Sequence, residues 1–359
     1  MEFTRRDTKI LKGVAICLML YHHLFAFPER VMAGSFASLY YFNDTNLSVC
    51  LGAFGRICVP MFTFLSGYGC YMASTQEENM SALVQKRLWG LYKTFWMVFF
   101  VCLPGILYTH RYSRPSDMIS ELVYNFLSLH STFNEEWWFV LPFALLLVLF
   151  PAIKRFLERE RASLYTDFLI TVMINAVIVY IIPVIAEEKL FSAARETVFW
   201  KHTEELLEIL PAYITGCVFA RYNLLSEAKA RFGGRPAWCA AALAAMLAVF
   251  FIRSVNRDYY DFINAAVFIL ALTVLLPLKP MRLIGRAFEK LGEQSALMWL
   301  THTLLCYHWL QPLVYAPKYA PLIFLWLVVL SYGFAKLIRL FYKLLGRVYG
   351  KLSRAGQAA

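Results

Sequence analysis

Long apolar stretches recur along the whole chain, and the charged residues gather in the short segments between them. Each stretch is roughly 20 residues long, the length that a helix needs to cross the hydrocarbon core of a bilayer. The sixth stretch is the weakest, because Pro211 and Gly216 interrupt it, although membrane helices tolerate both residue types. We predict an all-α, polytopic transmembrane helical bundle of about ten spans. The predicted spans are 10–29, 48–73, 88–109, 137–156, 165–185, 205–221, 236–253, 261–278, 294–314 and 319–342.

The composition agrees with a membrane protein. Of 359 residues, 60% are hydrophobic and 16% are charged, whereas about a quarter of the residues in a soluble domain are charged. The formal net charge is +11, and most of the 35 Lys and Arg residues lie on alternate segments between the spans. Basic residues that flank membrane spans favour the cytoplasmic side. The pattern predicts that both termini are cytoplasmic, and it explains the positive charge without a nucleic-acid partner.

No polar linker divides the chain into separate domains. We predict one integral membrane domain over residues 1–345 and a short basic cytoplasmic tail over residues 346–359. The first span is expected to be retained, not cleaved as a signal peptide, because its apolar core is long and contains two histidines. The eight cysteines show no paired or metal-binding spacing. We expect them to pack inside the spans, and we expect no metal.

Polar residues inside a membrane span are costly and are candidates for function. The first span reads KILKGVAICLMLYHHLFAF and contains Lys12, His22 and His23. On a helix, His23 lies about 16 Å beyond Lys12, past the midplane. The separation is close to three turns, so Lys12 and His23 share a face, whereas His22 points about 100° away. Lys12 and His23 are therefore candidate functional residues, and His22 has either a supporting or a packing role.

The second span contains an arginine and a group of small and aromatic residues, in GRICVPMFTFLSGYGCYM. Arg56 stays charged at any relevant pH, so it needs an anionic or strongly polar partner if it is buried. The alternative is that Arg56 extends to the outer interface. Ser66 and Gly67 are small enough to permit close helix packing.

The fourth span begins with two carboxylates and two tryptophans, in FNEEWWFVLPF. Trp137 and Trp138 are typical of a membrane interface. The alternative is that they bind substrate. Glu135 and Glu136 are either solvated or available to pair with Arg56 or a histidine. In the ninth span His302 lies near mid-depth, whereas His308 lies nearer the outer interface and is expected to be structural.

These residues carry a family resemblance over nearly the whole chain. The chain resembles acyltransferase family 3, the integral membrane O-acyltransferases that modify bacterial surface glycans. Lys12 to His23 matches the family's motif of a basic residue, ten residues and a histidine. GRICVPMFTFLSGY, EWWFVLPF and LGEQSALMWLTH are similar to three further family motifs. The chain departs from the family's Arg-x-x-Arg motif, since Gly90 stands three residues after Arg87.

The resemblance implies acyl transfer from a thioester to a sugar hydroxyl, which needs a base and a positive group near the developing oxyanion. Histidine suits the role of base at neutral pH. His23 is expected to act as the general base or as a transient acyl carrier, and Arg56 and His22 complete the catalytic candidates. The expected donor-binding residues are Lys12, Arg87 and Lys93, and the expected acceptor-cavity residues are Ser66, Tyr68, Glu136, Trp138 and His302.

The resemblance favours acetyl-CoA as the acyl-CoA donor, a glycan or glycolipid as the acceptor, and a multi-pass location in the bacterial inner membrane in contact with its lipids. A polytopic transporter or a glycolipid flippase is the alternative, because such proteins also carry polar residues near the midplane. Transporters often consist of two related halves, and the sequence shows no convincing internal repeat.

Overall fold

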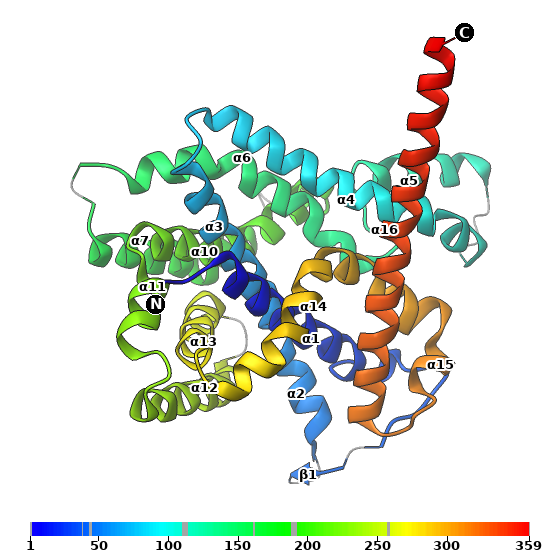
Figure 1. The fold of residues 1–359 in the computed structure, drawn as a ribbon. Coiled ribbons are helices and arrows are strands. Elements are labelled where there is room, and N and C mark those ends of the chain that lie inside the picture. Colours follow the sequence, from blue (N-terminus) through cyan, green and yellow to red (C-terminus); the bar gives the residue numbers. More distant parts are fainter. Residues whose placement is uncertain are drawn as a thin grey trace.

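The computed structural model describes residues 2–37, 39–42, 45–109, 114–160, 162–187, 192–256 and 259–358. Within these residues the only strands are β1 (Tyr41–Phe42) and β2 (Thr45–Asn46), a short antiparallel pair beside helix α2. Helices form nearly all of the remaining structure, and they cross one another in a bundle (Figure 1). The prediction of an all-α helical bundle is confirmed.

The helices differ widely in length. The longer ones are α1 (Arg5–Phe25), α3 (Cys58–Ser74), α4 (Met80–Thr109), α6 (Val140–Leu157), α10 (Val198–Arg221), α12 (Pro236–Asn256), α13 (Asp261–Leu275), α14 (Lys279–Thr303) and α16 (Ala320–Ala358). The shorter ones are α2 (Leu47–Gly55), α5 (Pro115–Phe126), α7 (Leu164–Ala176), α8 (Ile182–Glu187), α9 (Ser192–Arg195), α11 (Leu224–Phe232) and α15 (Gln311–Tyr315). Two 3₁₀ segments, η1 (Pro28–Arg30) and η2 (Glu135–Phe139), and two π-helical segments, η3 (Val177–Ile181) and η5 (Leu304–Trp309), adjoin them.

Each of the ten predicted spans overlaps a helix. Six helical stretches among the described residues are long and apolar enough to cross a membrane, so the chain has the build of a multi-pass membrane protein. The total of ten crossings and the cytoplasmic position of both termini stay predictions. The six stretches are Leu47–Ser74, Met80–Thr109, Glu135–Leu157, Leu164–Ala186, Pro236–Arg253 and Ala320–Arg347.

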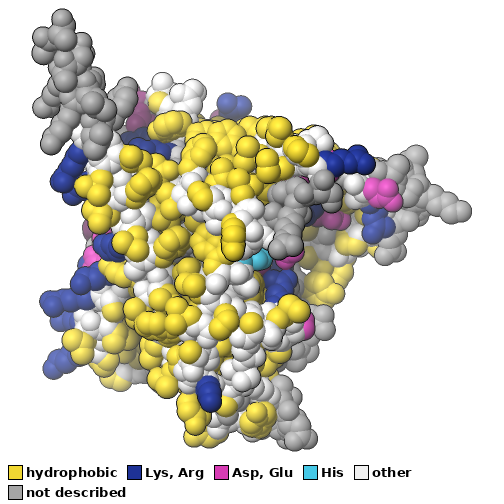
Figure 2. Space-filling model, turned by 90° about the vertical axis from the view of Figure 1, so that its right-hand side faces the viewer, with side chains coloured by type: hydrophobic (Ala, Val, Ile, Leu, Met, Phe, Trp, Pro, Cys, Tyr) yellow, Lys and Arg dark blue, Asp and Glu magenta, His cyan; other side chains and the backbone are white. Residues whose placement is uncertain are grey.

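The least apolar helices lie inside the bundle. Helix α10 was the weakest predicted span, yet almost all of its residues from Ile209 to Ala220 are buried against other helices. The stretch Leu164–Ala186 is the most apolar of the six and the least buried. This inversion is expected in a bilayer, because the outer helices must present apolar side chains to lipid. Hydrophobic side chains accordingly cover much of the face in Figure 2.

Helix α16 extends beyond the rest of the bundle to the C terminus (Figure 1). Residues 346–358, predicted as a basic tail, continue this helix without a break. Residue 359 and the side chains from residue 348 onward lie outside the described part of the chain.

Helices α1 and α14 cross at a distance that only glycine permits. A Cβ atom at Gly13 would lie 1.9 Å from the carbonyl oxygen of Phe288, and a Cβ atom at Gly292 would lie 1.9 Å from that of Lys9. Both contacts are far shorter than a van der Waals contact, and the obstructing atoms belong to the backbone. The two helices therefore touch along their backbones, as small residues allow in membrane bundles.

Helices α3 and α10 cross in the same way. A Cβ atom at Gly67 would lie 2.1 Å from the carbonyl oxygen of Tyr213, and one at Gly216 would lie 2.0 Å from that of Phe64. The close packing expected of Gly67 is thus present. The two crossings fix four of the helices that surround the cavity described below.

We expect Gly292→Ala to lower the stability of the purified protein by about 1–3 kcal/mol or more, because the added methyl group forces α1 and α14 apart. The measurement is the midpoint of thermal unfolding in detergent. Gly333→Ala is the matched control, since a Cβ atom on Gly333 of α16 meets nothing within 4 Å. Equal unfolding midpoints for the two variants would contradict the close crossing.

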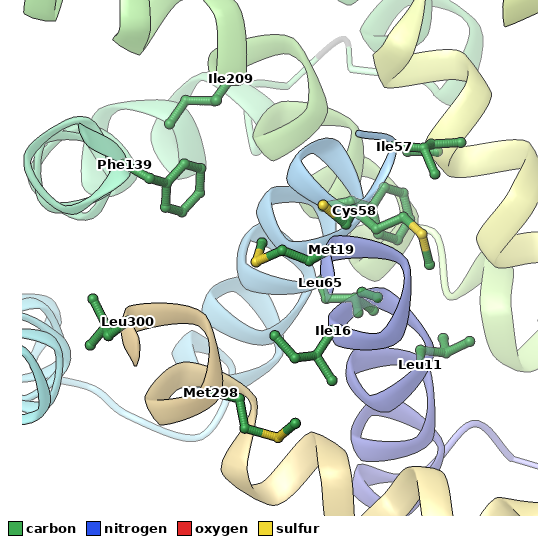
Figure 3. Close-up of a cluster of buried hydrophobic side chains, with 14 of the residues drawn as sticks. Leu11, Ile16, Met19, Ile57, Cys58, Leu65, Phe139, Ile209, Met298 and Leu300 are labelled. Carbon is green, nitrogen blue, oxygen red and sulfur yellow. The ribbon is translucent and has the colours of Figure 1, made fainter. Parts of the chain in front are cut away.

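Buried side chains from several helices meet in the centre of the bundle (Figure 3). Leu11 and Ile16 of α1 and Met298 of α14 belong to this core. Other hydrophobic side chains in the same view form the wall of a cavity. These are Met19, Cys58, Leu65, Phe139 and Leu300, from α1, α3, η2 and α14.

Candidate active site

A cavity of about 1270 Å³ runs between α1, α3, α4, α10, α14 and the segment η2–α6. One end, here the basic end, is lined by Arg5, Lys12, Lys86 and Arg87. The other, here the histidine end, is lined by His22, His23, Arg56 and Glu136. Helix α1 connects the two, and Lys12 and His23 are about 16 Å apart along it. The cavity thus brings together candidates that lie far apart in the sequence.

His23 and Glu136 face each other at the histidine end. His23 Nε2 lies 3.5 Å from Glu136 Oε2, and both side chains are largely buried. A carboxylate in this place stabilises the imidazolium that forms when Nε2 takes a proton. Glu136 thus lies at a ring nitrogen that could take up a proton, close enough to stabilise the positive charge.

His302 lies directly behind His23. The ring centroids are 4.8 Å apart, and His302 is fully buried. His302 Nδ1 donates a hydrogen bond to the Trp299 carbonyl oxygen at 2.8 Å, so its Nε2 is left as an acceptor. Among the described residues, neither His302 Nε2 nor His23 Nδ1 has a hydrogen-bond partner. The two unpartnered nitrogens therefore belong to adjacent rings, and His302 presents an unprotonated nitrogen beside the His23 ring.

The segment η2 holds Glu136 in place through contacts with α14. Asn134 Oδ1 caps the segment by accepting from the Glu136 backbone N–H at 3.2 Å, and it also accepts from Thr303 Oγ1 at 2.9 Å. Trp137 Nε1 donates to the Leu300 carbonyl oxygen at 2.8 Å. Trp137 is therefore a structural residue, whereas the neighbouring Trp138 lines the cavity.

Arg30 is a second partner of Glu136 that the sequence did not single out. Arg30 Nη1 lies 3.4 Å from Glu136 Oε1, and the guanidinium stacks over the Phe27 ring at 4.4 Å. Pro28 starts the segment η1, which returns Arg30 to the bundle. The available signal was this proline at the end of the first span, which stops the helix and redirects the chain.

Arg56 stands at a break that the sequence did not predict, because α2 ends at Gly55 and α3 begins at Cys58. Its Nη2 donates to Glu208 Oε1 at 2.7 Å, and 34% of the Arg56 side chain is exposed. The sequence predicted an anionic partner but did not identify Glu208. Glu205 and Glu208, three residues apart at the start of the weakest span, were the available signal, since residues at that spacing share a helix face.

A buried ion pair supports the α2–α3 break. Arg253 Nε and Nη2 contact the two carboxylate oxygens of Asp261 at 2.8 and 2.9 Å. Arg253 Nη1 donates to the carbonyl oxygens of Ala53 and Phe54, at 2.9 and 3.1 Å. These carbonyls belong to the last turn of α2, whose end needs such partners. The pair therefore fixes the backbone that precedes Arg56.

His22 serves the packing of α1 on α2 as well as the cavity wall. Its Nδ1 donates to the Gly52 carbonyl oxygen at 2.8 Å, and its ring meets His23 edge to face at 5.0 Å. The separate directions predicted for the two histidines are present, since His23 faces Glu136 instead.

At the basic end, Lys12 and Arg87 both line the cavity, and Arg87 Nη2 donates to the Gly69 carbonyl oxygen at 3.1 Å. Lys93 is exposed and is not among the lining residues. Tyr68 and Ser66, predicted for the acceptor, line the cavity as well. Tyr68 contacts Phe3, whose ring lies 5.4 Å away, so it belongs to the basic end.

The described residues show no group of three or more His, Cys, Asp or Glu side chains that could hold a metal ion. All eight cysteines are free, and six of them are buried, as expected for packing residues.

The fold and the cavity together define a helical membrane protein with a buried histidine and carboxylate joined to a cluster of cations. The model of a family described as "Acyltransferase domain" matches residues 7–339, and the chain belongs to this family, acyltransferase family 3. The resemblance seen in the sequence is thereby confirmed, and the chain is a membrane acyltransferase. No curated protein and no solved structure matches the chain.

Proposed function

We propose that the chain is a bacterial inner-membrane O-acyltransferase that moves an acyl group, with acetyl favoured, from cytoplasmic acyl-CoA to a sugar hydroxyl of a cell-envelope or exported glycan. The basic end would face the cytoplasm and bind the donor, and the histidine end would bind the acceptor. This orientation agrees with the cytoplasmic termini predicted from the basic residues.

The observation that carries the proposal is the single cavity joining the two ends. Cations at the basic end suit the phosphates of acyl-CoA. The extended pantetheine arm of CoA can cover the distance of about 16 Å from Lys12 to His23. The thioester would therefore reach His23 while the nucleotide stays at the cations.

In the proposed reaction, His23 Nε2 accepts the proton of the sugar hydroxyl, and Glu136 stabilises the resulting imidazolium. The sugar oxygen attacks the thioester carbonyl carbon, the C–S bond breaks, and the CoA thiolate takes up the proton. Arg56 would orient its acidic partner, Glu208, at the acceptor end. His302 would hold the His23 ring in position from the opposite side.

Purified protein tests the proposal directly. We expect consumption of labelled acetyl-CoA that depends on His23, and loss of an acyl mass from the surface glycans of cells lacking the gene. Movement of a glycan or other solute across vesicles without consumption of the thioester would indicate a transporter instead.

We expect Arg87→Ala to raise the KM for acyl-CoA roughly threefold to tenfold, equivalent to about 0.7–1.4 kcal/mol, and to leave kcat nearly unchanged. The reason is that Arg87 would bind the donor and not the reacting atoms. Lys93→Ala on the same helix should have a smaller effect, because Lys93 does not line the cavity. An equal or larger rise in KM for Lys93→Ala would contradict this division of roles.

A further inference from the structure

The charges along the cavity are unevenly divided between its two ends. At the basic end, four cations are accompanied by one acidic lining residue, Glu77. The histidine end has the opposite balance. Its charged lining residues are Glu135, Glu136, Glu205, Glu208, Arg30 and Arg56. An anion is therefore attracted to the basic end and meets mostly carboxylates at the other.

Both arginines of the histidine end are already paired with carboxylates. Arg56 holds Glu208 at 2.7 Å. Arg30 lies 3.4 Å from Glu136 and 3.8 Å from Glu135. An anionic acceptor would have to compete with these carboxylates for the two guanidinium groups. Such an exchange leaves a carboxylate without its partner, and the cost is largest for Glu136, which is 16% exposed, and smaller for Glu208, which is 45% exposed.

The carboxylate of Glu205 also has a partner, His202, which is not among the residues that line the cavity. His202 Nδ1 lies 2.7 Å from Glu205 Oε2, and His202 Nε2 lies 2.9 Å from the Leu129 carbonyl oxygen. The hydrogen bond to Glu205 raises the pKa of His202 above its ordinary value. Lys201 Nζ lies 4.0 Å from Glu205. No cation that faces this end is thus left for an anionic ligand among the described lining residues.

The same groups suit an uncharged sugar. Ionised carboxylates accept hydrogen bonds from hydroxyl groups and donate none. Trp138 and Trp299 also line the cavity, and each packs against Phe139 at nearly a right angle, with ring centroids 5.5 and 5.4 Å from it. Flat aromatic rings provide apolar surface for the C–H faces of a sugar.

We propose that the histidine end takes a neutral, hydroxyl-rich sugar as the acceptor and discriminates against sugars that carry a carboxylate or a phosphate. The inference deepens the proposed acyl transfer and rests on it. Glu208 is the main determinant of this selectivity, because it occupies the guanidinium of Arg56.

The first test identifies the sugar that carries the acyl group. Glycans from cells with and without the gene are compared by tandem mass spectrometry under conditions that preserve esters. We expect the acyl mass on a neutral hexose, deoxyhexose or N-acetylhexosamine. An acyl mass on a uronic acid, a sialic acid or a phosphorylated sugar overturns the proposal. If acetyl-CoA consumption still depends on His23 in that case, only the acceptor class fails and the proposed function stands.

The second test measures binding by the purified full chain, with 4-nitrophenyl glucoside and 4-nitrophenyl glucuronide as a matched pair of probes. We expect the glucoside to bind at least about tenfold more tightly. Glu208→Gln should narrow this ratio by freeing Arg56, whereas Glu208→Asp, which keeps the carboxylate, should preserve it. Equal or tighter binding of the glucuronide by the unchanged chain overturns the proposal, as does an unchanged ratio in a folded Glu208→Gln variant.

Discussion

His23→Ala should reduce acyl transfer by roughly 10²- to 10⁴-fold, the usual contribution of a positioned general base. The expectation rests on the buried His23–Glu136 pair, because, of the described histidines that line the cavity, His23 is the one whose ring nitrogen lies within ion-pair distance of a carboxylate. The measurement is the rate of acetyl-CoA consumption by purified protein in the presence of its glycan acceptor.

His308→Gln is the matched control for this prediction. His308 is exposed, lies in η5 and does not line the cavity, so the rate should stay near that of the unchanged protein. A His23→Ala protein that transfers the acyl group at the normal rate would rule out the base assignment. An acylated His23 peptide in a stopped reaction would instead support a covalent acyl carrier.

Arg253→Ala should destabilise the protein by about 3–5 kcal/mol, because it leaves Asp261 without its partner in a buried position. Arg253 is 4% exposed and Asp261 is 14% exposed, so water replaces little of the lost interaction. The carbonyl oxygens of Ala53 and Phe54 lose a donor as well. The free energy of unfolding is measured in mixed micelles. The transfer activity of the fraction that stays folded is then measured separately.

The double variant Arg253→Met with Asp261→Leu isolates the electrostatic part of this effect. Removing both charges avoids the unpaired carboxylate, so the double variant should be more stable than Arg253→Ala. If the stability losses of the single variants Arg253→Met and Asp261→Leu add up to the loss of the double variant, the ion pair contributes little beyond packing.

Much of the site could be predicted from single residues, because a charged or polar group inside an apolar span is unusual wherever it stands. Lys12 and His23 were found in this way on the first span, Arg56 on the second and Glu136 on the fourth. The cavity brings all four together. The sequence could place each residue along its helix, but only the packing of the helices shows which faces meet.

Other contributors could not be predicted because they lie at the ends of spans. Arg30, Glu208 and Arg253 occupy positions where charged residues are usually solvated, so their charge alone did not mark them as parts of the site. Their inward direction follows from tertiary structure, namely the turn at Pro28, the burial of α10 and the pairing of Arg253 with Asp261. Lys93 does not line the cavity, which shows that a cation near a motif need not face it.

The backbone contact between α1 and α14 has a consequence for how the reaction would be driven. Gly13 and Gly292 leave no space for these helices to slide past each other. Helix α1 carries His23, and helix α14 carries His302. A carrier that alternates between two open states needs such sliding or rocking. Under the proposed function, donor and acceptor instead approach one rigid point from opposite sides. Only the acyl group then crosses the bilayer, and the thioester supplies the energy for this vectorial step without an ion gradient.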